Sequence, residues 1–212
     1  MIEPLQPVDS PPLSLRETIR ENAYLIFALV GMMWLVEIVD VFTPQSSLDR
    51  FGILTRQASG LPGIILAPFL HGGFQHLLGN SIPFIVLSAL VILSGRLIYL
   101  EVFFVTAMTA GIGTWLLAPP NSLHIGASGV VFGLLGFLIF RAWFGRRIGW
   151  IVVAIVAALL YGGLIFTLFR HQEGISWHGH FFGFAGGFLS AKWHVSGIVK
   201  ENAGSSLETP KP

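Results

Sequence analysis

Six long apolar segments constrain the fold of this chain more than any other feature of its sequence. A helix needs about 20 apolar residues to cross the ~30 Å hydrocarbon core of a bilayer. Segments of this kind run over residues 22–43, 75–94, 97–117, 127–141, 149–168 and 177–197. Only 11% of the residues are charged, whereas a soluble domain carries about 25%. The pattern predicts an all-α, polytopic membrane protein in which six transmembrane helices form a bundle in the lipid bilayer.

The polar ends divide the chain into three parts. Residues 1–21 lack the apolar core of a signal peptide and are expected to form a short cytoplasmic tail. Residues 22–198 hold all six apolar segments and form the predicted helical domain. Residues 199–212 are polar and are expected to be disordered. No internal repeat is visible, so the inverted-repeat architecture of many transporters gains no support.

Charge and cysteine content narrow the function and set an orientation. The net charge of +1 indicates no nucleic-acid partner, and the absence of cysteine excludes disulfides and thiolate metal ligands. If the N-terminus lies inside, nine basic residues face the inner side and three face the outer side. The nine are Arg16, Arg20, Arg96, Arg141, Arg146, Arg147, Lys192, Lys200 and Lys211, and the three are Arg50, Arg56 and Arg170. Positive residues concentrate on the cytoplasmic side of membrane proteins, so both termini are expected in the cytoplasm.

The fourth apolar segment is unusually short. Counting back from Arg141, only about 14 residues reach Ala127, which gives a helix of about 21 Å, starting near Ser128, against a hydrocarbon core of ~30 Å. The preceding stretch LAPPNSLHIG (117–126) contains two prolines and is not expected to be helical. Non-helical backbone at membrane depth is tolerated only inside protein or beside water. The sequence therefore predicts a cavity that opens to the outer side, with Ser128 at its floor.

Two glycine pairs predict which helices approach closely. Gly129 and Gly133 form a GxxxG pair in the fourth segment, and Gly183 and Gly187 form another in the sixth. Small residues at this spacing allow two helix backbones to come together. His180 shares the face of Gly183 and Gly187, because the three residues lie at positions i, i+3 and i+7.

Close packing of those two faces would bring a serine and a histidine to one level. Ser128 and His180 each lie at the outer start of their helix. A serine hydroxyl becomes a strong nucleophile when a neighbouring base takes its proton, and histidine suits that role. His76 and Asn80 lie four residues apart, near the outer end of the second segment. Together with the Ser128 amide, they are candidate donors to an oxyanion.

Each of these residues has a simpler interpretation when taken alone. Small-residue clusters in membrane helices usually serve packing, and Asn80 alone would indicate a hydrogen bond between helices. His76 alone would indicate a histidine at the membrane interface. The convergence of several polar groups at one predicted depth favours a serine nucleophile.

A metal site and an ion pathway are the competing hypotheses. The seven histidines, at positions 71, 76, 124, 171, 178, 180 and 194, form no HExxH motif. A zinc site would require His76, His180 and His124 to converge. A transporter would use Glu37, Asp40 and Glu101 as relays, although their positions near span ends suit interfacial hydrogen bonds better.

The ordered motifs resemble a known family. HGGFQHLLGN (71–80), GASG (126–129) and HFFGFAGG (180–187) match the HxxxN, GxSG and HxxGxxxG patterns of the rhomboid intramembrane serine proteases. The resemblance covers about 22–198, including GRLIYLEVFFVTAMTAG (95–111) in the third span. The first loop, about 44–71, is expected to be the family's membrane-embedded loop. The Trp-Arg pair often found there is not evident, since LTRQ (54–57) offers only Arg56.

The resemblance implies a fold, an activity and a set of residues. It implies a Ser128–His180 dyad, an oxyanion site at His76, Asn80 and the Ser128 amide, and Phe132 packed on the histidine ring. Gly126 belongs to the same GxSG motif. The implied function is a serine endopeptidase that cleaves transmembrane protein substrates without a metal or cofactor, in a bacterial inner membrane by analogy. The alternative is a catalytically silent relative that binds membrane clients, and the sequence does not indicate an oligomeric state.

Overall fold

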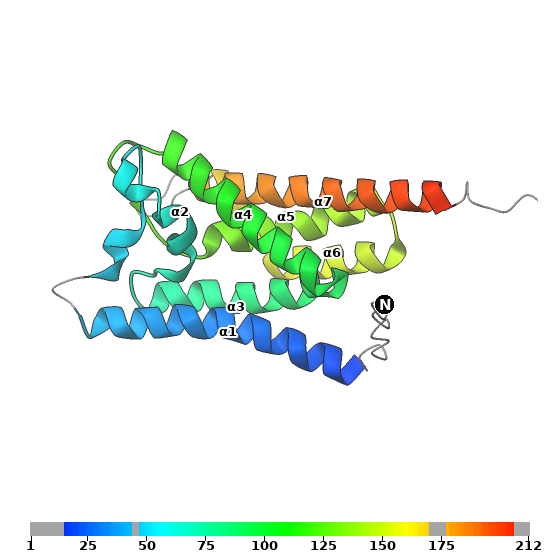
Figure 1. Ribbon diagram of the computed structural model, residues 1–212, viewed down its shortest axis with the longest axis horizontal. Helices are drawn as coiled ribbons and strands as arrows, with labels where there is room; N and C mark the ends of the chain where they lie inside the picture. The colour runs from blue at the N-terminus through cyan, green and yellow to red at the C-terminus, as the bar shows by residue number, and fades with distance from the viewer. Residues whose placement is uncertain (1–14, 44–46, 170–176, 206–212) are drawn as a thin grey trace, which may run out of the picture.

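Helices make up nearly all of the structure, as the apolar segments predict. The computed structural model describes residues 15–43, 47–169 and 177–205. The long helices are α1 (Leu15–Val41), α3 (Phe74–Val91), α4 (Arg96–Leu117), α5 (Ser128–Gly145), α6 (Ile148–Tyr161) and α7 (Trp177–Ser205). The short elements are η2 (Leu48–Phe51), β1 (Ile53–Leu54), η3 (Ala58–Gly60), α2 (Gly63–Leu66), η4 (Ala67–Phe69), η5 (Ile92–Ser94), β2 (Leu123–His124) and η6 (Gly162–Phe169). The long helices run roughly side by side along one axis of the molecule (Figure 1).

Five stretches of the described residues are long and apolar enough to cross a membrane. They are Arg20–Val41, Phe74–Ser94, Arg96–Leu117, Ser128–Gly145 and Ile148–Ile165. A shorter apolar stretch spans Ala58–Phe69. The chain is thus an all-α polytopic membrane protein. Helix α7 is long enough to cross but less apolar, since three histidines and Lys192 interrupt its sequence.

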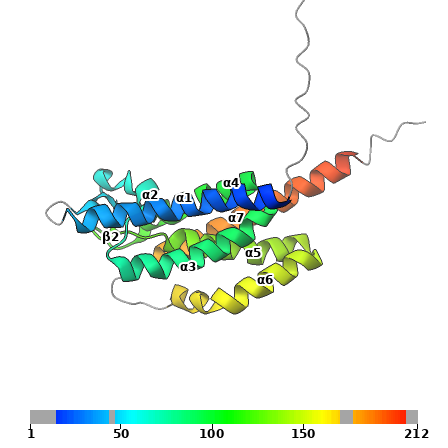
Figure 2. The same cartoon turned by 90° about the horizontal axis from the view of Figure 1, so that it is seen from below.

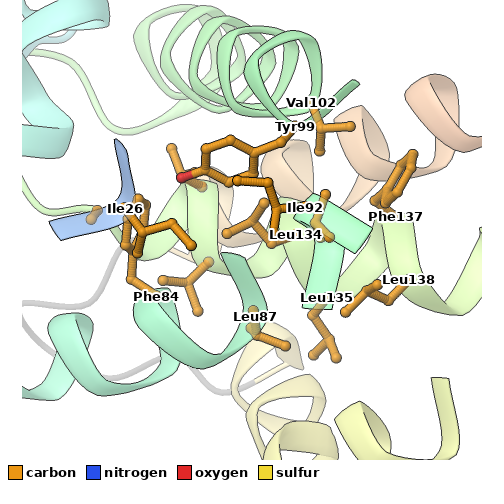
Figure 3. Packing of buried hydrophobic residues seen from close by; sticks show 14 of the residues in the cluster. Ile26, Phe84, Leu87, Ile92, Tyr99, Val102, Leu134, Leu135, Phe137 and Leu138 are labelled. Atoms are coloured by element: carbon orange, nitrogen blue, oxygen red, sulfur yellow. The ribbon is translucent and has the colours of Figure 1, made fainter. Parts of the chain in front are cut away.

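Helix α5 lies at the centre of the bundle. It packs against α3, α4, α6 and α7, while α1 packs against α3 (Figures 1 and 2). Sixty-seven per cent of the α5 span is buried within the protein, against 6% for the α6 span. The core between these helices combines side chains from α1, α3, α4 and α5, including Ile26, Phe84, Leu87, Tyr99, Val102, Leu134, Leu135, Phe137 and Leu138 (Figure 3). Residues at the start of α5 are therefore held by neighbours on several sides.

The expectation of a short fourth span is wrong at its inner end. Helix α5 begins at Ser128 as predicted, but it continues past Arg141 to Gly145 and has 18 residues. Arg141 does not mark the membrane surface, because its side chain is buried and its guanidinium lies over the ring of Trp150 at 4.2 Å. An aromatic partner inside the protein lets the arginine remain within the helix. The position of Ser128 therefore has to be judged from its surroundings, not from helix length.

Two other boundaries differ from expectation. Helix α1 begins at Leu15, inside the segment expected to be a tail. Helix α7 begins at Trp177 as predicted but runs on to Ser205, so part of the stretch expected to be disordered is helical. Polar residues such as Lys200 and Glu201 are good helix formers and let a helix continue beyond the membrane. Residues 206–212, also expected to be disordered, lie outside the described residues.

The first loop folds into a compact series of short turns. Strand β1 pairs antiparallel with β2, so that Ile53 faces His124 and Leu54 faces Leu123. The Arg56 Nε donates to the Leu116 carbonyl oxygen at 3.2 Å, although no tryptophan precedes Arg56. These contacts attach the loop to the end of α4 and to the segment that leads into α5. The structure thus adds a two-residue β ladder to a fold expected to be wholly helical.

Candidate active site

Ser128 and His180 meet at the interface of α5 and α7. Ser128 is the first residue of α5, and His180 lies in the first turn of α7. The His180 Nε2 lies 2.9 Å from the Ser128 Oγ, which is hydrogen-bond distance. The Phe132 ring stacks on the His180 ring with centroids 4.2 Å apart and planes 14° apart. The stack fixes the plane of the imidazole, so that its Nε2 stays aimed at the hydroxyl.

Glycines make this close approach possible. A Cβ atom built on Gly183 would overlap the carbonyl oxygen of Gly129, and one built on Gly187 would overlap that of Gly133. A Cβ on Gly129 would lie 3.2 Å from the Gly179 carbonyl oxygen. The backbones of α5 and α7 therefore touch along both GxxxG pairs. Any larger residue at these positions would move the serine away from the histidine.

Among the residues that the structure describes, none holds His180 from the other side as the acid of a catalytic triad does. Its ring is buried, and its Nδ1 makes no hydrogen bond within the described part of the chain. The Ser128 hydroxyl can donate to Nε2 only if that nitrogen carries no proton. In the neutral ring the proton then resides on Nδ1. Among the described residues, the contact that orients the imidazole is the aromatic stack with Phe132.

His76 and Asn80 lie beside Gly126, two residues before the serine. A Cβ on Gly126 would lie 2.8 Å from the His76 Nε2 and 3.7 Å from the Asn80 Nδ2. Gly126 has a φ of +113°, which a residue with a side chain rarely adopts. Its N–H donates to the Ala67 carbonyl oxygen at 2.9 Å. The glycine thus keeps open a small space bounded by two polar nitrogens.

His76 and Asn80 each keep an N–H group that makes no hydrogen bond among the described residues and could donate to a reactant. The Gly72 N–H donates to the His76 Nδ1 at 3.4 Å, so the proton of a neutral His76 lies on Nε2, on the side of Gly126. The Asn80 Nδ2 donates to the His76 carbonyl oxygen at 3.1 Å. An amide NH₂ group carries two hydrogens, so the second remains for another acceptor. Ser128, at the N-terminus of α5, adds a backbone N–H with no helical partner.

A hollow adjoins the serine. It encloses about 410 Å³ of empty space and is lined by side chains and backbone from the first loop, α4, the loop before α5, and α5 itself. Among its walls are Ile64, Thr114, His124, Gly126 and Ser128. The hydroxyl of Ser128 is therefore open to a reactant on one side while its histidine is buried on the other.

Two histidines near this region were not assigned a role from the sequence. His71 is fully buried, and its ring meets the His76 ring edge-on with centroids 5.1 Å apart. Burial, followed by the nearby His76, lowers the pKa of His71 to about 4. His124 lines the hollow and lies 2.8 Å from the Ser122 Oγ through its Nε2. Burial and then the charge of His178 lower the pKa of His124. His71 lies in a loop and His124 in the two-residue strand β2, so no helical periodicity could reveal which way either side chain points.

The groups proposed for a metal site or an ion pathway are scattered. Among the described residues, no three His, Asp or Glu side chains converge in a way that could hold a metal ion. Glu101 pairs with His194, whose Nε2 lies 3.1 Å from the carboxylate, between α4 and α7. Asp40 accepts hydrogen bonds from Ser47 and Leu48 at the start of η2. Glu37 is buried in α1. Glu37 and Asp40 lie about one turn apart on α1, and Glu101 lies on α4, so the three carboxylates do not form one continuous path.

The fold and the site together define a class: a polytopic helical membrane protein with a serine–histidine pair buried between two helices. The family model of the rhomboid domain matches residues 58–196, and the chain belongs to the rhomboid family. This family consists of integral membrane proteins that are generally serine proteases, which act on membrane proteins and contact the lipid bilayer.

Similar proteins come from bacteria. "Uncharacterized protein Rv1337" of Mycobacterium tuberculosis is 37% identical over 175 residues, which cover 78% of this chain and 72% of that protein. "Uncharacterized protein ML1171" of Mycobacterium leprae is 35% identical over 174 residues, 78% of this chain and 68% of that protein. "Rhomboid protease GluP" of Bacillus subtilis is 32% identical over 179 residues, 79% of this chain but 34% of GluP.

Proposed function

We propose that this protein is an intramembrane serine endopeptidase that cleaves peptide bonds in or near the transmembrane segments of its substrates. The observation that carries the proposal is the 2.9 Å contact between the Ser128 Oγ and the His180 Nε2, beside an open hollow. A serine paired with a base in this way is the usual arrangement for acyl transfer. Membership of a family of membrane proteases supports the same reaction.

In the proposed mechanism His180 acts first as a base and then as an acid. Its Nε2 takes the proton of the Ser128 hydroxyl while Oγ attacks the carbonyl carbon of the scissile bond. The protonated His180 then gives this proton to the departing amine. A water molecule that enters from the hollow hydrolyses the acyl-enzyme, with His180 as the base once more. The stacked Phe132 keeps the imidazole in place through both steps.

The oxyanion forms where the open donors converge. His76 Nε2 and Asn80 Nδ2 border the space that Gly126 leaves open, and the Ser128 N–H, at the N-terminus of α5, is the third proposed donor. The positive end of α5 adds a favourable field at the same point. Donors fixed in advance at the position of developing charge lower the barrier of acyl transfer.

The proposed topology has six spans with both termini in the cytoplasm. Helix α7, the sixth span, has 29 residues and packs along α5 and α4. The start of α1 and the α5–α6 turn, with Arg146 and Arg147, lie at the same end of the bundle (Figure 1). The positive-inside rule assigns that end to the cytoplasm, so the active site opens to the outer side of a bacterial inner membrane. Substrate helices must unwind to offer a free carbonyl, so Gly or Pro near the cut should favour cleavage.

Cleavage of a reporter membrane substrate by the purified full chain tests this proposal. Ser128→Ala and His180→Ala should each abolish cleavage, and a fluorophosphonate probe should label Ser128 in the wild type. Ser190→Ala is the matched control, because Ser190 is a buried serine of α7 whose Oγ makes no hydrogen bond in the described part of the chain. Full activity in Ser128→Ala would refute the assignment of the nucleophile. Activity that survives this substitution but disappears with a chelator would indicate a metal site instead.

The alternative is a catalytically silent protein that holds membrane clients. Experiments on the same purified full chain distinguish this alternative from the protease. A silent protein would co-purify with a substrate, but it would neither cleave the substrate nor react with the fluorophosphonate. The intact Ser128–His180 contact argues against this alternative.

A further inference from the structure

The turn between α5 and α6 carries positive charge that the proposed mechanism does not use. Arg141 lies in the last turns of α5. Arg146 is the residue directly after α5, and Arg147 is the residue directly before α6. The two helices meet at the end of the bundle opposite the active-site loops (Figure 2). Within the described part of the chain, none of these three arginines forms an ion pair with a carboxylate.

Arg141 is the unusual member, because it is buried without a counter-charge. Only 7% of its surface is exposed, and its guanidinium lies between the rings of Trp150 and Phe137. Its Nε and Nη1 are buried and make no hydrogen bond to any described residue. Its Nη2 is not among these buried atoms, so it is the nitrogen that could donate to a group outside the protein. A charged side chain within a membrane span normally pairs with an acceptor, and the described residues offer this guanidinium none.

The start of α6 offers further donors at the same place. Trp150, which Arg141 covers, lies in the first turn of α6. Arg147 occupies the N-cap of α6 without a side-chain hydrogen bond, three residues before the Trp150 that Arg141 covers. The first N–H groups of α6, those of Ile148 and Gly149, have no acceptor among the described residues. An uncapped helix N-terminus beside two guanidinium groups is an environment that favours an anion.

An apolar hollow lies on the same pair of helices. It holds about 650 Å³ of empty space and is lined by Ile139, Ala142, Trp143, Arg146 and Ile151. Four of these five side chains are apolar, and the fifth is an exposed arginine of the turn. A surface of this kind suits a molecule with a hydrocarbon chain and a negative head.

We propose that the α5–α6 turn binds the phosphate of an anionic phospholipid. The phosphate accepts hydrogen bonds from Arg141 and Arg147 and faces the N-terminus of α6, while an acyl chain lies in the hollow beside Arg146. Basic pockets between helices at the membrane surface bind anionic lipid head groups by this chemistry. A competing explanation is that the arginines only balance the negative C-terminal end of α5. That explanation gives no preference for one lipid over another.

Native mass spectrometry of the full chain in detergent, with added lipid, tests the proposal. Phosphatidylglycerol should bind about tenfold or more tightly than phosphatidylcholine with the same acyl chains. Both lipids carry a phosphate, but the choline ammonium cancels its charge and is repelled by the arginines, whereas the glycerol head group leaves a net negative charge. Arg147→Gln should reduce the preference toward one. Arg147 is exposed and caps α6 through its backbone, so this variant should fold, which a circular-dichroism melt checks. Arg141→Gln should have the same effect wherever it folds.

Arg50→Gln is the control, because Arg50 is an exposed arginine of η2 in the first loop. It should leave the lipid preference unchanged. Equal binding of the two lipids by the wild type, or an Arg147→Gln variant that keeps the full preference, would overturn the proposal. Millimolar inorganic phosphate should compete poorly, and displacement of the lipid by phosphate alone would identify a free-phosphate site instead. The readout is binding, so its failure would be distinct from a failure of the proposed protease activity.

Discussion

Replacing Gly183 with alanine should separate the two helices that hold Ser128 and His180. The new Cβ would overlap the carbonyl oxygen of Gly129, and it would lie 2.8 Å from that residue's carbonyl carbon and 3.1 Å from its Cα. Carbon atoms in contact normally lie about 3.5–4.0 Å apart. Because all three atoms are backbone, no rotamer change relieves the clash. Helix α7 must therefore move away from α5, by on the order of 1 Å.

The size of the effect follows from this displacement. Overpacking a well-packed interface costs about 1–3 kcal/mol, and alanine returns about 1 kcal/mol through its higher helix propensity. We expect a net loss of up to about 2 kcal/mol in the free energy of unfolding. A shift of about 1 Å would stretch the serine–histidine contact beyond hydrogen-bond distance, and kcat/KM should fall about 10²-fold. Activity should thus suffer more than stability.

Two measurements on purified protein check this expectation: unfolding in detergent, and cleavage of a reporter substrate. Gly31→Ala is the matched control, since a Cβ on Gly31 of α1 would meet no atom within 4 Å. That variant should keep wild-type activity and be equally stable or slightly more so. If Gly183→Ala matched Gly31→Ala in both measurements, the idea that backbone contact sets the serine–histidine distance would be wrong.

Three further predictions address other parts of the site. Asn80→Ala should lower kcat by about 10²–10³ with little change in KM, as expected for a lost oxyanion donor; an unchanged kcat would exclude that role. The lowered pKa of His71, about 4, means that the folded state binds fewer protons than the unfolded state below pH ~6.5. The free energy of unfolding should therefore decline by up to about 3 kcal/mol from pH ~6.5 to pH ~4, and His71→Gln should remove this part of the pH dependence. Thr55→Val should cost about 1–3 kcal/mol, because buried Thr55 donates to the Pro119 carbonyl at 2.5 Å and accepts from the Ser122 N–H at 3.0 Å. Chemical unfolding curves measure that cost, and a variant as stable as the wild type would show that the first loop does not depend on Thr55.

The helices could be predicted because a membrane imposes a length and a composition on each of them. The third span, expected over 97–117, appears as α4 from Arg96 to Leu117, and α5 begins at Ser128 as expected. The inner end of α5 could not be predicted in this way. Arg141 reads as a surface residue in the sequence, and only the three-dimensional contact with Trp150 explains why it is buried.

In the candidate site too, the residues on helices could be predicted from the sequence, whereas those in the first loop could not. Glycine and histidine spacing on two helices pointed to one shared interface, because residues three, four and seven apart lie on one helix face. The first loop carries no such periodicity. Its attachment depends on pairs such as Thr55 with Pro119 and Ile53 with His124, which are distant in sequence. His71 lies in this irregular backbone, so its burial beside His76 could not be predicted from the sequence and follows only from the folded loop.

The two members of the serine–histidine contact lie 52 residues apart in the chain, on α5 and on α7. At a synthesis rate of about 5–20 residues per second, the ribosome needs roughly 3–10 s to add that many residues. Ser128 is thus made, and its helix can be inserted, before His180 exists. If the two residues act as proposed, the nascent chain has no peptidase activity toward its neighbours in the translocation machinery. On this proposal, synthesis of α7, the helix that carries His180, is the step that completes the enzyme.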